Sequence, residues 1–208
     1  MKNLNDKSRN AYNKKADHYD STFDGRFTQE FKNLLTATIV LPDKCSVLDV
    51  ACGNGSLLFG LNKIKSINGF GIDIADRMIE NAATLNPDMK FQVSGCEAMP
   101  FQDESMDIIT VCAAYHHFPD VVAFAKEAKR ILKPEGKLYI AEVYLPSFLR
   151  FLINPFVPLS KAGDVRLYSP LEIVDNFKKI GFQRPEIIIA ARIQIVSVMK
   201  PQRDPVCL

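Results

Sequence analysis

Residues 47–55 read VLDVACGNG, and this stretch decides the fold. It begins with apolar residues typical of a buried strand and ends in a turn that contains Gly53 and Gly55. Glycine lets the backbone pass close to a ligand without a side chain in the way. A helical pattern follows at residues 56–61, SLLFGL, and the start of a helix leaves free backbone N–H groups that can face the ligand. The stretch therefore predicts a strand, a glycine turn and a helix that together hold a small molecule.

The next predicted strand, residues 67–73, ends in Asp73. An acid at this place in a βαβ unit can accept hydrogen bonds from the two hydroxyls of a ribose, although it can also simply cap the following helix. The dinucleotide pattern G-x-G-x-x-G is incomplete, because Leu58 stands where its third glycine would be. Asp49, next to the turn, suits a cationic ligand group better than a pyrophosphate. The unit is therefore expected to bind a nucleoside ligand other than a nicotinamide dinucleotide.

The rest of the chain alternates apolar β-branched runs with helical stretches, which is typical of a doubly wound α/β fold. Runs as apolar as residues 108–111, IITV, indicate a parallel sheet that is buried on both faces. One helix is predicted to start at Pro119, and the last long helix to start at Ser169 and end at Gly181. The last two strands are separated by only a short break, which predicts an antiparallel pair. Strands are predicted at residues 46–50, 68–73, 90–94, 106–112, 137–143, 184–190 and 192–199.

The length of 208 residues fits one domain, residues 1–208, that can bury a core. A net charge of +2 gives no reason to expect nucleic acid as a partner. The N-terminal residues lack the apolar core of a signal peptide, and no apolar run is long enough to span a bilayer. Five scattered cysteines without ligand spacing are typical of reduced thiols. These features together predict a cytoplasmic protein.

Five motifs occur in the order in which one enzyme family carries them: VLDVACGNG at 47–55, GIDIADRMI at 71–79, EAMPF at 97–101 with MDIIT at 106–110, HHF at 116–118 and LKPEGKL at 132–138. With them the chain resembles the class I S-adenosylmethionine-dependent methyltransferases, in particular the small-molecule branch with a single domain. The resemblance extends over about residues 10–200. It implies a Rossmann-like, doubly wound sheet of seven strands, mostly parallel with an antiparallel terminal strand, and helices on both faces. It also implies S-adenosylmethionine as the cofactor.

The resemblance assigns roles in cofactor binding. Asp49 would accept a hydrogen bond from the amino group of the cofactor, or would only hold the loop in shape. Gly53 and Gly55 would pass beneath the methionine and the ribose, Asp73 would bind the ribose hydroxyls, and Ile74 would lie against the adenine. The expected cofactor-binding residues are Tyr19, Asp49, Ala51, Gly53, Gly55, Asp73, Ile74, Cys96, Glu97 and Cys112.

One departure from the family concerns the adenine. The family usually has an acid two residues before the glutamate of the third motif, and here Gly95 stands two residues before Glu97. The contact of that acid with the adenine amino group would therefore be lost or made by water. The backbone N–H of Cys96 remains available to the ring.

His116 and His117 follow the fourth predicted strand, where the family's methyl-transfer site lies. A histidine titrates near neutral pH and can take a proton from a hydroxyl or enol of the substrate. Both are therefore candidates for the catalytic base, and the alternative for each is a place in the entry to a helix. No metal site is expected, because neighbouring histidines do not easily converge on one ion and no third ligand is evident.

Two segments lie outside the repeat of strands and helices. Residues 6–40 are predicted to form two helices, and residues 144–168 are apolar and aromatic. Ligands of open α/β sheets bind beyond the carboxyl ends of the strands, and both segments can cover that edge, as a helical lid and an apolar substrate cover. Residues 12–20 resemble the family's leading helix, in which Tyr19 would face the cofactor. Residues 144–168 can equally pack over the sheet as core or form a dimer surface.

The expected function is S-adenosylmethionine-dependent methyl transfer to a small-molecule acceptor, and the aromatic residues at 144–168 favour a hydrophobic or aromatic one. The donor is already activated, so alignment matters more than strong acid–base groups. Two other classes stay open. A protein that binds S-adenosylmethionine or S-adenosylhomocysteine without catalysis is permitted by Gly95, and a nucleotide-dependent oxidoreductase is opposed by Leu58. Whether O, C or N is methylated, and the oligomeric state, stay open as well.

Overall fold

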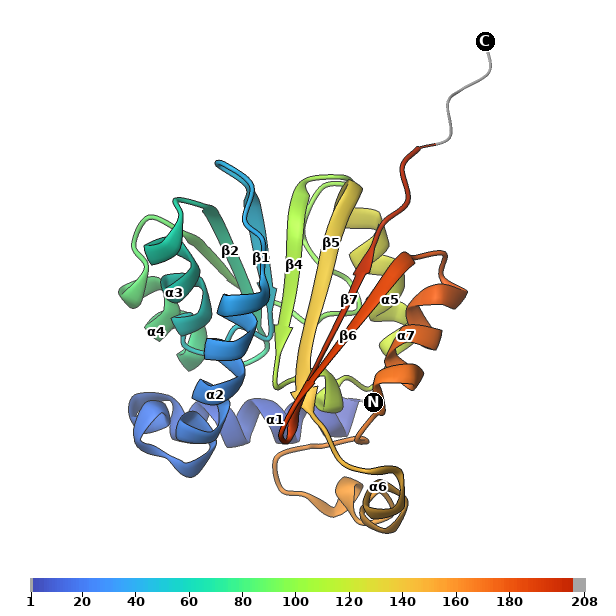
Figure 1. Cartoon of the computed structure of the whole chain (residues 1–208). Coiled ribbons are helices and arrows are strands. Elements are labelled where there is room, and N and C mark those ends of the chain that lie inside the picture. Colours follow the sequence, from blue (N-terminus) through green and yellow to red (C-terminus); the bar gives the residue numbers. More distant parts are fainter. Residues whose placement is uncertain (1, 204–208) are drawn as a thin grey trace.

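A computed structural model describes residues 2–203 and shows one seven-stranded sheet with helices on both faces (Figure 1). Residue 1 and residues 204–208, which the expected domain includes, lie outside that part. The strands are β1 (Ser46–Val50), β2 (Asn68–Asp73), β3 (Lys90–Val93), β4 (Met106–Cys112), β5 (Leu132–Val143), β6 (Gln183–Ala190) and β7 (Ile193–Met199). The α-helices are α1 (Lys2–Lys15), α2 (Phe23–Thr38), α3 (Ser56–Ile64), α4 (Asp76–Leu85), α5 (Val121–Ile131), α6 (Ser147–Ile153) and α7 (Pro170–Lys179). The short 3-10 helices are η1 (Ala16–Ser21), η2 (Tyr115–His117) and η3 (Val157–Leu159).

The strand order in the sheet is β3-β2-β1-β4-β5-β7-β6. The first five strands along the chain pair in parallel, and β7 pairs antiparallel with both β5 and β6. The Rossmann-like, mostly parallel sheet expected from the sequence is therefore confirmed. The reversed strand is the last one along the chain, and it lies inside the sheet because β6 occupies the edge.

Both faces of the central strands are buried, as their apolar sequences predict, whereas the edge strands β3 and β6 are mostly exposed. Val47 of β1 packs on one face with α2 and α3, while Leu48 and Val50 pack on the other face with α5 and α7. Successive side chains of a strand point to opposite faces, so each apolar strand serves two cores. The helices on the two faces do not cover the carboxyl ends of the parallel strands.

Capping residues decide where two of the helices start. Ser169 and Glu172 form a reciprocal capping box at the start of α7, and Gly181 follows its end with φ +91°, as predicted. The predicted start of a helix at Pro119 is wrong by two residues. Asp120 is the cap of α5 instead, because its carboxylate accepts hydrogen bonds from the backbone N–H groups of the first turn.

Helix α1 and residues 144–168, which we name the cover, gather at one end of the sheet, whereas α2 packs on a face of the sheet and not over that end as the sequence suggested (Figure 1). Figure 1 shows α1 and α6 at the end where the parallel strands finish. The N–H of Val165 in the cover donates to the carbonyl of His116 (2.8 Å), which ties the cover to η2. Within residues 2–203, no helix combines the length and the apolar character that crossing a membrane requires.

Candidate functional site

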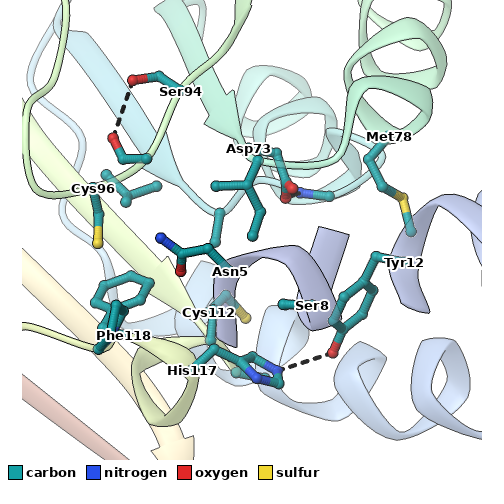
Figure 2. A pocket seen from close by; sticks show the side chains of 18 of the residues that line it. Asn5, Ser8, Tyr12, Asp73, Met78, Ser94, Cys96, Cys112, His117 and Phe118 are labelled. Carbon is teal, nitrogen blue, oxygen red and sulfur yellow. Dashed lines mark hydrogen bonds between the residues drawn. The ribbon is translucent and has the colours of Figure 1, made fainter. Parts of the chain in front are cut away.

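A pocket opens beyond the carboxyl ends of β1, β2 and β4, and α1 forms part of its wall (Figure 2). Its empty volume is about 740 Å³, which includes open solvent at the mouth. Most of the residues expected at the site line this pocket: Tyr19, Ala51, Gly53, Asp73, Ile74, Cys96, Glu97, Cys112 and His117. Three others, Asp49, Gly55 and His116, do not line it.

The two glycines of the turn serve different purposes. Gly53 has a φ of +52°, and a Cβ built on it would meet no atom within 4 Å, so its backbone faces open space in the pocket. Gly55, with a φ of +75°, is the N-cap of α3, and a Cβ there would come within 2.8 Å of Asn86 Nδ2 and 3.0 Å of Ala82 Cβ. Gly55 therefore allows α3 and α4 to pack closely rather than a ligand to approach.

Asp73 holds the glycine turn against the entry to α4. Its Oδ1 accepts from the backbone N–H of Ala75 at the start of α4 (2.8 Å), and its Oδ2 accepts from that of Gly53 (2.9 Å). Burial raises the pKa of this carboxyl group although those hydrogen bonds act to lower it. A carboxylate offers about four acceptor positions, so two remain for a ligand in the pocket.

Asp49 is buried behind the pocket. Its Oδ1 accepts a hydrogen bond from the hydroxyl of Thr110 on the neighbouring strand (2.7 Å). Burial raises the pKa of Asp49 to about 7, against the effects of Thr110 and of the nearby charge of Lys32. A buried acid poised in this way responds strongly to a cation placed near it.

The adenine end of the expected site is formed by residues 94–97. Gly95, Cys96 and Glu97 all line the pocket. A Cβ built on Gly95 would stand 2.9 Å from Glu97 Oε2. The carboxylate of Glu97 therefore occupies the space where a side chain at residue 95 would begin.

The first helix contributes residues that the sequence did not reveal. Asn5, Ser8 and Tyr12 of α1 line the pocket, and Tyr12 was noticed only as part of a family motif. The hydroxyl of Tyr12 is hydrogen-bonded to Nε2 of His117 (3.0 Å), and the two rings meet edge to face (Figure 2). No local pattern marks these positions, because they become functional only when α1 crosses the ends of the strands.

His116 is turned away from the pocket and held by Glu142. The Nδ1 and the backbone N–H of His116 lie 2.8 Å and 3.1 Å from Oε2 of this fully buried carboxylate on β5. Burial acts to lower the pKa of His116, but the charge of Glu142 outweighs it and the pKa is raised. Burial acts to raise the pKa of Glu142, but His116 outweighs it and the pKa is lowered. The pair joins η2 to β5.

His117 is the histidine that reaches the pocket. Burial and the neighbouring His116 lower its pKa, so the ring is neutral near pH 7. Its Nδ1 lies 2.9 Å from Oδ1 of Asp164 in the cover, a residue that the sequence did not suggest. The rings of His116 and His117 are 4.1 Å apart, and both present a nitrogen to Asp164. The reasoning that neighbouring histidines do not converge and that no third ligand is evident is therefore wrong, because the cover supplies an acid.

Comparisons with known proteins point to one family of enzymes. The family model described as "Methyltransferase domain" matches residues 48–140. The chain is 31% identical over 166 residues to demethylmenaquinone methyltransferase of Thermotoga maritima, covering 69% of this chain and 72% of that protein. It is 38% identical over 105 residues to 2-methyl-6-phytyl-1,4-hydroquinone methyltransferase of Synechocystis, covering 49% of this chain but only 33% of that protein.

Solved structures share the fold at lower identity. One solved structure is the complex between the Haloferax volcanii Trm112 methyltransferase activator and a methyltransferase. A chain of this complex superposes with a TM-score of 0.79 at 20% identity, covering 92% of this chain and 98% of the other. The [4+2]-cyclase SpnF superposes with a TM-score of 0.69 at 16% identity, covering 84% and 82%. These likenesses establish the fold, and the relative from Thermotoga establishes the family. The chain belongs to the class I S-adenosylmethionine-dependent methyltransferases, and its cofactor is S-adenosylmethionine.

Proposed function

We propose that this methyltransferase acts on a hydrophobic hydroquinone-type acceptor: an aromatic ring with hydroxyl groups and a hydrocarbon tail, methylated at a ring carbon. The observation that carries the proposal is the contact of the pocket with the apolar cover, through His117 and Asp164. The printed names of the relatives support it, since they act on demethylmenaquinone and on a phytyl-substituted 1,4-hydroquinone. The [4+2]-cyclase among the structural neighbours is a reminder that the fold alone does not choose a reaction.

The pocket residues suit the parts of the cofactor. The open backbone at Gly53 leaves room for the methionine and ribose, and the free acceptor positions of Asp73 suit the two ribose hydroxyls. Asp49 lies where its ionised form would be favoured by the cationic amino group. Glu97, in the space beside Gly95, can accept from the adenine amino group in place of the family's acid. Gly53, Asp73, Asp49 and Glu97 thereby share the recognition of the cofactor.

The acceptor side is built around His117. When bound, S-adenosylmethionine supplies an activated methyl group, so the protein has to align the acceptor and remove a proton. The hydroxyl of Tyr12 can donate to Nε2 of the neutral imidazole, so the proton of an acceptor hydroxyl can pass to the oxygen of Tyr12 while the proton of Tyr12 passes to Nε2. The aromatic ring of the acceptor then becomes electron-rich and nucleophilic at carbon. Asp164 Oδ1 lies 2.9 Å from Nδ1, at the other side of the His117 ring. Phe118 and Cys112 give the neighbouring wall an apolar character that suits an aromatic ring.

The test is methyl transfer from labelled S-adenosylmethionine to reduced naphthohydroquinones and benzohydroquinones, with and without a prenyl tail. We expect a C-methylated product, and a loss of turnover of at least tenfold in His117→Gln, with a loss of affinity for S-adenosylhomocysteine no larger than that of Tyr12→Phe. Turnover of phenols or amines but not of hydroquinones would overturn the acceptor class. Binding of S-adenosylhomocysteine without turnover of any acceptor would favour the non-catalytic alternative.

A further inference from the structure

Three side chains from two distant parts of the chain converge beside the pocket. His116 and His117 come from η2, and Asp164 comes from the cover. His116 Nε2 lies 3.6 Å and His117 Nδ1 2.9 Å from Oδ1 of Asp164. One possible ligand atom from each of the three residues lies within 4.8 Å of the other two. Two ligands of a tetrahedral zinc ion at about 2.0–2.1 Å stand roughly 3.3 Å apart, so this cluster is close to the size of a metal site.

Both imidazoles are held by their other nitrogen. Nδ1 of His116 is hydrogen-bonded to Oε2 of Glu142, which turns Nε2 toward Asp164. Nε2 of His117 is hydrogen-bonded to the hydroxyl of Tyr12, which directs Nδ1 toward the same carboxylate oxygen. Metal-binding histidines are oriented in this way, with the second ring nitrogen held by a carboxylate or another polar group.

The surroundings of His117 Nδ1 favour a cation at this place. This atom is buried and has no hydrogen-bond partner within residues 2–203, although Asp164 Oδ1 is only 2.9 Å away. A proton on Nδ1 lies in the plane of the ring and does not point at the carboxylate, so it leaves that contact bent. A buried polar atom without a partner is costly. A cation that lies close to both His117 Nδ1 and Asp164 Oδ1 would give each of these atoms a partner.

We propose that His116 Nε2, His117 Nδ1 and Asp164 form a binding site for one divalent transition-metal ion of the zinc type. Two imidazole nitrogens and one carboxylate are a donor set that zinc, cobalt and iron(II) accept, and magnesium or calcium disfavour. Of the three residues only His117 lines the pocket, and its Nδ1 is buried, so the ion lies behind the pocket wall on the side of the cover. A metal on Nδ1 leaves the ring proton on Nε2, so the base described under the proposed function is the metal-free form. Metal binding at this place does not depend on the proposed function.

The test uses cobalt(II) as a spectroscopic probe on the full chain after treatment with a chelator, without cofactor or acceptor. We expect one equivalent of cobalt(II) to give d–d absorption in the visible range, no thiolate charge-transfer band, and displacement by one equivalent of zinc. The absence of the thiolate band excludes the free cysteines Cys45, Cys52, Cys96 and Cys112 as the ligands. Asp164→Asn and His117→Gln should each weaken binding at least tenfold.

His18→Gln is the matched control, because His18 is exposed and lies outside the cluster, and it should bind cobalt(II) like the wild type. Thermal unfolding separates loss of the site from loss of the fold. Metal-free Asp164→Asn should unfold cooperatively near the metal-free wild type, and zinc should raise the melting temperature of the wild type only. Equal cobalt(II) binding by the wild type and Asp164→Asn, or no stoichiometric binding by the wild type, would overturn the site. Either result would leave the methyl-transfer assay with hydroquinones unaffected.

Discussion

Tyr12 and His117 are hydrogen-bonded across the pocket, with 3.0 Å between the hydroxyl oxygen and Nε2, although 105 positions separate them in the chain. The rings meet at an interplanar angle of 86°. Through this pair, α1 is tied to the loop that follows β4. The N-terminal helix therefore forms part of the site rather than an independent appendage.

Tyr12→Phe should weaken both the fold and the site. The substitution keeps the ring but removes the hydroxyl, and it leaves a buried nitrogen of His117 without its partner, which costs about 1–3 kcal/mol. We expect the melting temperature to fall by several degrees and the affinity for S-adenosylhomocysteine to fall severalfold, as measured by calorimetric titration. Tyr144→Phe is the control, because no hydrogen bond of its hydroxyl is found among the described residues, and it should change neither quantity. Wild-type affinity in Tyr12→Phe would show that α1 does not shape the pocket.

Asp73→Asn should reduce cofactor affinity strongly. Asparagine keeps one acceptor for the turn but loses the charge and one of the acceptor oxygens that would face the ribose. A hydrogen bond to a charged group contributes about 1.5–3 kcal/mol, so the Kd for S-adenosylhomocysteine should rise about 10-fold to 100-fold. Asp88→Asn removes an exposed charge instead and should bind like the wild type. Equal affinities of the two variants would exclude Asp73 from ligand recognition.

The raised pKa of Asp49 predicts that the cofactor-free protein loses stability as the pH rises. Below about pH 4 the carboxyl is protonated in both the folded and the unfolded chain. Between there and the folded value of about 7, only the unfolded chain ionises, so the free energy of unfolding falls with rising pH. Asp49→Asn cannot ionise and lacks this contribution. Between pH 5 and pH 8, the melting temperature of the wild type should therefore fall further than that of the variant; parallel curves would contradict the assignment.

Binding of the cofactor should also change the ionisation of Asp49. A cationic amino group near Asp49 favours its ionised form, so binding of S-adenosylhomocysteine at pH 6 should release protons. Titration calorimetry in two buffers of different ionisation enthalpy measures this number directly. Asp73 also has a raised pKa and contributes in the same direction, so Asp49→Asn should reduce the release without abolishing it. An unchanged release in Asp49→Asn would mean that Asp49 does not sense the cofactor.

Much of the fold could be predicted because its signals are local. Alternation of apolar runs, the Ser169 cap and Gly181 are written within a few residues of the elements that they define. The signals of Gly53 and Asp73 are equally local, and both residues line the pocket as expected, whereas Gly55 does not. The sequence predicted a helix start at Pro119. The carboxylate of Asp120 instead accepts hydrogen bonds from the first turn of α5 and so sets the start of this helix.

The remainder of the site depends on contacts between distant segments. Asn5 and Ser8 reach the pocket only because α1 crosses the ends of the strands, and no pattern in their neighbourhood announces this. Asp164 lies in an irregular part of the cover and acquires a role through its distance to His116 and His117. A single sequence contains no record of such distances, which is why the acidic third member of this cluster was missed.

The exposed apolar side chains of the cover should matter for tailed acceptors only. Phe151 is 77% exposed, so Phe151→Ser removes no core packing and should leave the melting temperature and the binding of S-adenosylhomocysteine unchanged. If these side chains receive the hydrocarbon tail, KM for a prenylated hydroquinone should rise severalfold while KM for the same ring without a tail stays constant. Phe23, which is 74% exposed on α2, offers a control of matched exposure, and Phe23→Ser should affect neither acceptor. An equal rise of KM for both acceptors in Phe151→Ser would instead indicate that the cover shapes the pocket itself.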